Sequence, residues 1–434
     1  MVTTYTYPSG WPRSEMYRVQ INGRPVDVAA TGVGDFVSLA FQGPIEVEVE
    51  ANFPLAGAVL QPVSRGIQPV IQANRARWQM ASPVDLCFQP LGQKPFFFYA
   101  SSPSQDLPTS GVRRFRSGQI HDIGELELHD GETLYLEGGA VVRGCVRASG
   151  ARNIRIAGPG ILAGDFYQPG ANSRRSIVFD NCQHCQIENI IMVRPSSWMI
   201  VIGGSQDISV HGVRQLGECL CSDGVDVVGS QRIEIADCFL RNGDDCVAIK
   251  ALDYRGDATT RATADWRQNV EDVVVRRCAL LSYSGAAAME IGYETRCDSI
   301  RRIQFTDCDV LGVHQGFGAP FGIHNGDRAT VSDVVWENIR VEHYYGKLVD
   351  FRVLHARYSQ DAERGHIRDV TLRQIRVQNS QFNAGYSISL IGGYDAAHRV
   401  QNINFEDFQI DGQAARSGDD FDLHTRHASG IGFR

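Results

Sequence analysis

The sequence lacks any apolar run close to the about 18 residues that a membrane-spanning helix requires. Its first residues, M-V-T-T-Y-T-Y-P-S-G-W-P, contain no basic stretch followed by an apolar segment, which an export signal would show. We therefore expect no membrane partner and a cytoplasmic location, or a secreted protein if a leader has been removed.

Basic residues are too few to build a surface for nucleic acid. The chain has 42 Lys and Arg against 50 Asp and Glu, a formal net charge of −8. Recognition of a phosphate backbone depends on clustered Lys and Arg, so we expect no nucleic-acid partner. A polyanionic substrate is disfavoured for the same reason.

Cysteine gives no sign of a disulfide framework or a metal site. The count of 11 is odd, and without an export signal reduced thiols are the natural expectation. Cys182 and Cys185 form a C-x-x-C pair around His184, but no second ligand pair follows at a zinc-site spacing. We predict no metal and no cofactor.

The second part of the chain instead carries a repeat. Its pattern is apolar, any, apolar, any, any, apolar or Cys, any, apolar. Copies begin at Ile154, Cys185, Ile208, Ile233, Val273, Ile303, Val334, Val370 and Ile403. Their spacing falls in the roughly 20–50 residue range of solenoid proteins.

Each copy alternates with period 2, is rich in β-branched residues and ends in Gly, Asn or Asp, which is typical of strand and turn rather than of helix pairs. The sequence thus predicts an all-β chain whose main body is a right-handed parallel β-helix, with side chains stacked in internal ladders. Cys238, Cys278 and Cys308 hold the same place in successive copies, as buried ladder residues would.

The first 100 residues lack this repeat. Short alternating segments such as I-E-V-E-V-E-A, separated by Gly and Pro, predict a small β-sandwich domain over residues 1–100. The Pro- and Ser-rich stretch 101–111 reads as a linker, and residues 112–434 form the β-helix catalytic domain.

Two acidic motifs stand one coil apart, S-D-G-V-D from Ser222 and R-N-G-D-D-C-V-A-I-K from Arg241. Residues one coil apart lie about one strand spacing, roughly 4.8 Å, from each other in space. Asp223, Asp244 and Asp245 should therefore cluster on one face. Clustered carboxylates raise one pKa and so supply both an acid and a base for glycoside hydrolysis. The alternative is a solvated acidic turn.

These motifs resemble N-T-D-G-x-D and D-D-C-x-A-I-K of the polygalacturonase family, glycoside hydrolase family 28. The segments G-G-A-V-V-R-G, I-R-I-A-G-P-G-I-L-A-G and P-S-S-W-M-I are similar to its early coils, so the resemblance covers about residues 110 to 345. A β-sandwich before the β-helix also resembles the dextranase and isopullulanase family 49. Either resemblance implies an inverting hydrolase with Asp223, Asp244 and Asp245 as catalytic set, for which we predict Asp244 as acid and the other two as base.

The chain departs from family 28 in two places. Ala287 stands where the His of the family's G-H-G motif would fall, and F-G-I-H-N-G-D replaces the R-I-K that grips a uronate carboxylate. Glu290 and Glu294 add negative charge nearby. These departures favour a neutral carbohydrate, such as an α-glucan, over polygalacturonate.

Further residues near the motifs are predicted to bind substrate. They are Lys250, Glu290, Tyr293, Glu294, Trp198, Asp226 and His324. A simple Lys–Asp ion pair is an equal interpretation for Lys250, and aromatic side chains beside a solenoid often only pack. His314 lies in a Gly-rich stretch and is open to either interpretation.

Two other functions remain open on this fold. One is a polysaccharide lyase or epimerase, for which the acidic cluster would hold calcium, and the other is a non-catalytic carbohydrate-binding protein. The sequence does not specify the sugar, the linkage, internal or terminal cleavage, or the oligomeric state.

Overall fold

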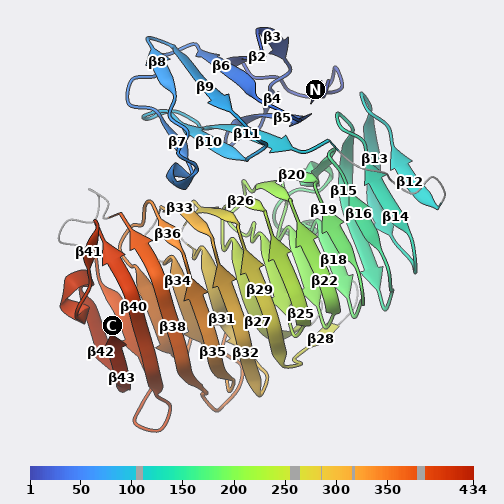
Figure 1. Cartoon of the computed structure of the whole chain (residues 1–434). Helices are drawn as coiled ribbons and strands as arrows, with labels where there is room; N and C mark the ends of the chain where they lie inside the picture. Colours follow the sequence, from blue (N-terminus) through green and yellow to red (C-terminus); the bar gives the residue numbers. More distant parts are fainter. Residues whose placement is uncertain (104–110, 255–263, 285, 315–317, 379–386) are drawn as a thin grey trace.

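The computed structural model describes residues 1–103, 111–254, 264–284, 286–314, 318–378 and 387–434, and shows a small N-terminal β domain beside a long parallel β-helix (Figure 1). Most of the predicted linker, residues 104–110, lies outside the described residues, as do residues 315–317 after His314. None of the helices in the described part is long and apolar enough to cross a membrane.

Two sheets make up the N-terminal domain. One contains β1 (Val2–Thr4), β4 (Ala29–Ala30), β5 (Asp35–Phe41), β7 (Val59–Gln61), β10 (Leu86–Gln89) and β11 (Phe96–Ser101). The other contains β2 (Tyr17–Ile21), β3 (Arg24–Val26), β6 (Ile45–Ala51), β8 (Val70–Gln72) and β9 (Arg75–Met80). In β6 the apolar side chains are buried and the Glu side chains face outward, so one shared core lies between the sheets.

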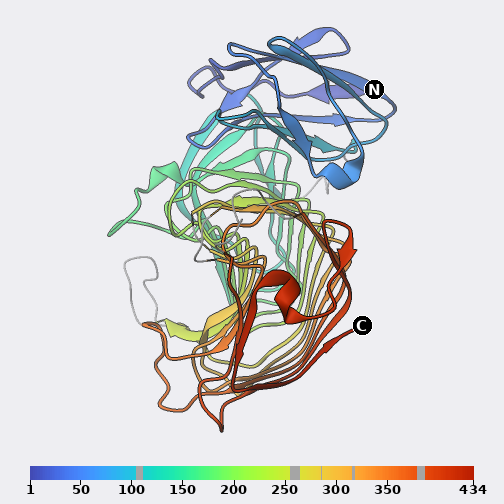
Figure 2. The ribbon, with the colours of Figure 1, turned by 90° about the vertical axis from the view of Figure 1, so that its left-hand side faces the viewer.

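The β-helix consists of three parallel ladders that succeed each other around every coil (Figure 2). It opens with β12 (Val112–Phe115), β13 (Ile120–Glu127), β14 (Thr133–Leu136) and β15 (Val141–Ser149). What we call the repeat ladder then runs through β16 (Arg155–Ala157), β19 (Gln186–Glu188), β22 (Gln206–His211), β25 (Gln231–Ala236), β29 (Val270–Arg276), β32 (Ser299–Thr306), β35 (Thr330–Glu337), β38 (His366–Val377), β40 (Val400–Ile410) and β43 (Ala428–Phe433).

The docking ladder contains β17 (Ile161–Ala163), β20 (Ile191–Val193), β23 (Arg214–Leu216), β26 (Phe239–Asn242), β30 (Ala279–Ser282), β33 (Asp309–Val313) and β36 (Arg340–Val341). The site ladder contains β18 (Ile177–Asp180), β21 (Ile200–Gly203), β24 (Val225–Val228), β27 (Val247–Tyr254), β31 (Met289–Thr295), β34 (Phe321–Asn325), β37 (Val349–Val353), β39 (Ser389–Gly392) and β42 (Leu423–Arg426). Smaller additions are β28 (Ala264–Trp266), β41 (Gln413–Ala414) and the 3-10 turns η1 (Val63–Arg65), η2 (Gly164–Phe166) and η4 (Gly418–Phe421).

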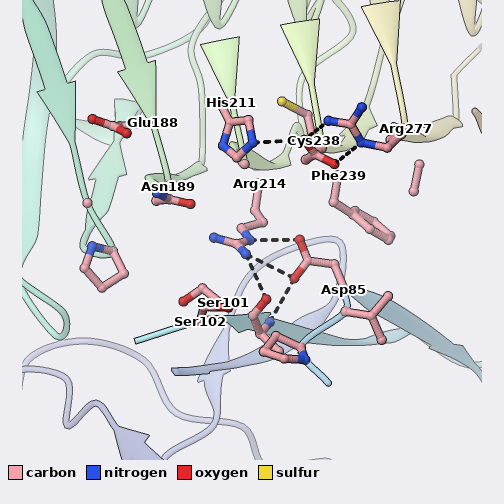
Figure 3. Close-up of a pocket in the computed structure, with 18 of the residues that line it drawn as sticks. Asp85, Ser101, Ser102, Glu188, Asn189, His211, Arg214, Cys238, Phe239 and Arg277 are labelled. Carbon is pink, nitrogen blue, oxygen red and sulfur yellow. Dashed lines mark hydrogen bonds and ion pairs between the residues drawn. The ribbon is translucent and has the colours of Figure 1, made fainter. Parts of the chain in front are cut away.

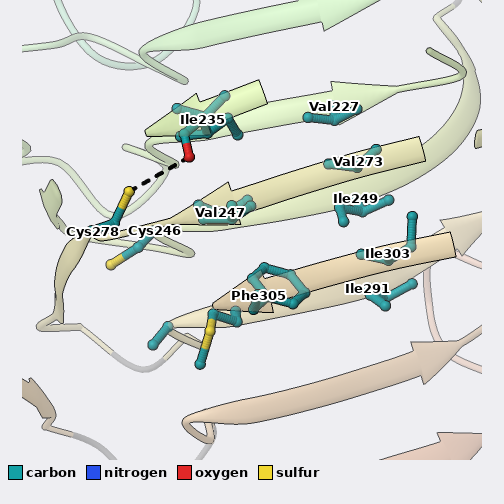
Figure 4. Close-up of a cluster of buried hydrophobic side chains, with 14 of the residues drawn as sticks. Val227, Ile235, Cys246, Val247, Ile249, Val273, Cys278, Ile291, Ile303 and Phe305 are labelled. Atoms are coloured by element: carbon teal, nitrogen blue, oxygen red, sulfur yellow. Dashed lines mark hydrogen bonds between the residues drawn. The ribbon is translucent and has the colours of Figure 1, made fainter. Parts of the chain in front are cut away.

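The predicted repeat coincides with the observed register. Ile233 pairs with Ile208 before it and with Val273 after it, and the partners Ile303, Val334, Val370 and Ile403 follow in order. Every coil therefore places the same apolar position against its neighbour, and the interior becomes a stack of Val, Ile and Phe side chains (Figure 4).

The cysteines belong to this interior. Cys238, Cys278 and Cys308 are buried in successive coils, and the backbone N–H of Cys278 lies 3.4 Å from Cys308 Sγ. Cys182 and Cys185 are also buried, and their thiols donate to the backbone carbonyls of Ala148 and Gln183. These contacts support the structural interpretation of the C-x-x-C pair, and all 11 thiols are free.

The N-terminal domain packs against the docking ladder. An apolar layer joins aromatic side chains such as Phe97 and Tyr99 to Phe239. Beside this layer Arg214 pairs with Asp85 next to a cavity of about 550 Å³, whose lining includes His211 and Arg277, both in contact with Asp237 (Figure 3). Further along the ladder Glu342 accepts the N–H of Val63 at 2.6 Å.

One stacked aromatic position offers a test of the interior packing. The ring of Trp336 stacks on Phe305 at 5.5 Å and on Phe351 at 5.4 Å, and its indole N–H has no hydrogen-bond partner among the described residues. We expect Trp336→Ala to lower the free energy of unfolding by about 3–5 kcal/mol because it leaves a large cavity. Trp336→Phe should cost about 1–2 kcal/mol or less, since it also removes an unpaired buried N–H. Urea denaturation compares the two, and equal losses would contradict this account of the stack.

Candidate active site

The three predicted carboxylates meet at the start of two neighbouring strands of the site ladder. Asp223 precedes β24 and Asp245 precedes β27, and the N–H of Gly224 donates to the carbonyl of Asp245 at 2.8 Å. Asp244 adjoins them, and one oxygen from each of the three carboxylates lies within 4.8 Å of the others. The coil length that separates the two motifs therefore produces the predicted cluster.

Burial and mutual repulsion hold protons on this cluster. Burial, and secondly the charge of Asp223, raises the pKa of Asp244 to about 7. Burial also raises the pKa of Asp245, with Asp244 and Glu290 as the next causes. Because adjacent carboxylates cannot all ionise cheaply, at least one of them stays protonated near neutral pH.

The buried ammonium group of Lys250 offsets part of the negative charge of the cluster. Its Nζ lies 2.9 Å from Asp223 Oδ2 and 2.9 Å from Asp226 Oδ1. Burial alone would lower the pKa of Lys250, but Asp223 and Asp226 raise it well above its usual value. Asp226 is fully buried, and burial raises its pKa despite Lys250. Asp226, which we predicted to bind substrate, thus contacts Lys250 and is absent from the described cavity lining.

Asp245 is oriented by the backbone of the next coil. The N–H of Ala287 donates to Asp245 Oδ1 at 2.8 Å. The position at which the family motif has a histidine therefore contributes a main-chain donor, and its methyl side chain is buried at the cavity floor. A donor aimed at a carboxylate favours the ionised form of that group.

Glu290 and His324 form a second buried network beside the acids. His324 Nδ1 lies 2.7 Å from Glu290 Oε1 and its Nε2 lies 3.2 Å from Asp350 Oδ2. Burial lowers the pKa of His324, but Glu290 and Asp350 outweigh it and raise the pKa to about 9. Tyr293 stacks on the imidazole with ring centres 4.3 Å apart. The imidazole is therefore a cation at neutral pH, already shared between two anions.

Gly322 makes room for this network. A Cβ at residue 322 would lie 2.1 Å from Glu290 Oε2, so a side chain there would displace the carboxylate. Arg352 completes the arrangement by pairing with Asp350 at 2.6 Å. The sequence analysis did not predict Asp350 and Arg352. Their pairing with Gly322 and His324 in the next coil was the one signal that could have identified them.

A cavity of about 970 Å³ opens above these groups. It is lined by nine of the ten predicted site residues: Trp198, Asp223, Asp244, Asp245, Lys250, Glu290, Tyr293, Glu294 and His324. Leu220, Cys221, Arg357, Tyr358 and Gln360 line it as well and were not predicted. His314 is absent from the described lining and packs beside Tyr283 and His343.

The Lys250 site can be tested through stability. Lys250→Met leaves the anion of Asp223 buried without its cation, so we expect it to lower the free energy of unfolding by about 3–5 kcal/mol at pH 7. Adding Asp223→Asn should recover at least half of that loss. Adding Asp226→Asn should recover little, since burial raises the pKa of Asp226 and favours its protonated form. Urea denaturation of the three variants measures this, and rescue by Asp226→Asn would show that Asp226 carries the charge.

Sequence comparisons place these coils in a known group. The profile described as glycosyl hydrolases family 28 matches residues 141–418. A probable exopolygalacturonase C from Neosartorya fischeri is 26% identical over 184 residues, 39% of this chain and 38% of the relative. A probable polygalacturonase from Vitis vinifera is 28% identical over 145 residues, 32% of this chain and 28% of the relative. The matches thus span well under half the length of these curated relatives.

Solved structures share the whole architecture. Dex49A from Penicillium minioluteum superposes with a TM-score of 0.68 at 12% identity, covering 98% of this chain and 96% of that one. The family 28 exopolygalacturonase from Yersinia enterocolitica gives 0.53 at 14% identity, covering 99% and 95%. At such identities the likeness concerns the fold, and it confirms the predicted right-handed β-helix preceded by a sandwich-like domain.

Proposed function

The chain belongs to glycosyl hydrolase family 28, and from this premise we propose that it hydrolyses the glycosidic bonds of a neutral oligo- or polysaccharide, with inversion, through Asp223, Asp244 and Asp245. The observation that carries the proposal is the buried carboxylate cluster at the floor of a cavity large enough for several sugar units. The roles follow from the surroundings of each carboxylate.

Asp244 is the acid. Its pKa of about 7 keeps the proton available at neutral pH, and its side chain is the most exposed of the three. Asp223 is ion-paired with Lys250, which makes it the first base. Asp245 accepts the N–H of Ala287, which opposes the rise that burial and its neighbours cause in its pKa, and we assign it as the second base. Asp244 protonates the leaving oxygen while Asp223 and Asp245 take a proton from the attacking water.

The compactness of the cluster determines where that water sits. In most inverting enzymes acid and base are roughly 6.5–9.5 Å apart, with the water between them. Here one oxygen from each carboxylate lies within 4.8 Å of the others, which is closer than that range. In our proposal the water instead bridges Asp223 and Asp245, on the opposite face of the sugar from Asp244.

The charge of the cavity favours a neutral substrate. Six carboxylates line it, against the three bases Lys250, His324 and Arg357. Lys250 and His324 are each already shared between two carboxylates. A uronate would meet uncompensated negative charge, whereas sugar hydroxyls can donate to these acceptors.

Polygalacturonate is the second candidate. Two relatives bear polygalacturonase names, and Arg357 lies at the cavity wall beside Tyr358, over whose ring its guanidinium packs at 4.6 Å. This single cation could pair with one uronate carboxylate per chain.

The pH dependence tests the assignment of the acid. Since Asp244 acts only when protonated, we expect kcat/KM to fall tenfold per pH unit above about pH 7. Glu290 contributes to the raised pKa of Asp244, so Glu290→Gln should move this limb to lower pH. Glu294→Gln is the matched control, because Glu294 is not among the main causes of that shift. If the alkaline fall in kcat/KM occurs at the same pH in Glu290→Gln as in the wild type, Asp244 is not the acid.

The substrate and the stereochemistry are tested on a panel of α-glucan, galactan, arabinan, rhamnogalacturonan and polygalacturonate. We expect the wild-type protein to release a neutral sugar whose anomeric configuration is inverted, as followed by proton NMR. Asp244→Asn should lower the rate by about 10²–10⁴-fold, the usual contribution of a general acid.

Each other outcome on this panel has a definite meaning. A retained anomer would overturn the bridging water, and cleavage of polygalacturonate alone would make Arg357 the decisive contact. Unsaturated products that depend on calcium and vanish with chelator would establish a lyase. Binding without turnover of any member would favour a carbohydrate-binding protein.

A further inference from the structure

One ladder of side chains runs through the catalytic carboxylates, and its members from Trp198 to Ala287 line the cavity. In the site ladder seven strand residues pair with one another from coil to coil: Ile177, Ile200, Val225, Val247, Met289, Phe321 and Val349. Each member of the side-chain ladder lies two residues before one of them. The members are Arg175, Trp198, Asp223, Asp245, Ala287, Ala319 and Lys347. Backbone bonds confirm the stacking, since Met199 donates to the carbonyl of Asp223 and Ala288 to that of Ala319.

The ladder is bulky on one side of the acids. Trp198 stands one coil before Asp223, and its ring lies 4.4 Å from the guanidinium of Arg175 and 4.2 Å from Lys250 Nζ. Arg175 is itself buried, and cation–π contacts strengthen when desolvated. Trp198 is therefore a fixed wall. None of the described residues that line the cavity precedes it in the sequence.

The ladder is small on the other side. Ala287 and Ala319 follow Asp245 in the ladder. Ala287 and Gly318, the neighbour of Ala319, line the cavity, so the floor stays low over the next coils. The cavity continues past Gly292, Tyr293 and Gly318 to the loop 356–360 after β37. Three strand spacings separate β27 from β37, so the cavity floor extends roughly 14 Å beyond the acids on this side. On the other side only one spacing, roughly 4.8 Å, separates the acids from Trp198.

We infer that the enzyme removes single terminal sugars, because Trp198 closes the cavity one unit beyond the scissile bond while the remaining chain lies over Ala287 and Gly318. This inference rests on the proposed function. It makes Trp198, held by Arg175, the residue that determines terminal rather than internal cleavage.

The test follows the products of linear heptasaccharides and long polymers from the same five glycans over time. With wild-type protein we expect the monosaccharide from the earliest time point, while the viscosity of the polymer falls only in proportion to the bonds cleaved. Early internal fragments with a rapid loss of viscosity would overturn the inference and leave the hydrolase proposal standing. No product from any glycan would overturn both.

The variant Arg175→Ala/Trp198→Ala opens the wall. We expect the ratio of longer products to monosaccharide to rise at least tenfold, whereas Tyr345→Ala, an exposed aromatic outside the cavity lining, should keep the wild-type pattern. Circular dichroism checks that the double variant is folded, and the wild-type time course decides the question if it is not. A folded double variant that still releases only monosaccharide would show that Trp198 is not the wall.

Discussion

The register between successive coils is the constraint on which the rest of this molecule depends. Parallel pairing repeats one apolar position from Ile208 to Ile403 and thereby builds the core. The same pairing places Asp223 beside Asp245, which no local interaction between the two motifs would do. The fold and the site therefore depend on the same register between coils. A coil of different length between the two motifs would move Asp223 away from Asp245 while leaving the core intact.

The negative charge of the cavity is partly offset by buried cations, whose own partners lie in part outside the cavity lining. Asp223 is paired with Lys250, and Glu290 is paired with His324. His324 also contacts Asp350, which pairs with Arg352. Each network places a cation between two carboxyl groups. This arrangement lets carboxylates crowd the floor without exposing a positive surface to the ligand, and so the environment around the acids stays rich in acceptors.

The sequence predicted the fold, the repeat and the position of the acids because each is a matter of short-range periodicity. It also pointed to Glu290, Tyr293 and His324, which follow the double-Asp motif by one and two coils. Arg357 and Tyr358 were out of reach, since they lie in a loop whose path depends on tertiary packing rather than on the period. Asp226 shows a different limit. The motif singles out its identity, but only the structure shows that its side chain points beneath the cavity to Lys250.

Docking of the N-terminal domain has a consequence for the mechanics of the whole chain. A solenoid held together by nearest-neighbour contacts can lose its coils one at a time, starting from an end. Here the N-terminal domain contacts two coils that lie far apart along the axis. Asp85 pairs with Arg214 and Gly32 donates to Glu218 in one coil, and Val63 donates to Glu342 in the other. We therefore expect the coils between these contacts, which include those that carry the acids, to unfold together with the small domain rather than one at a time.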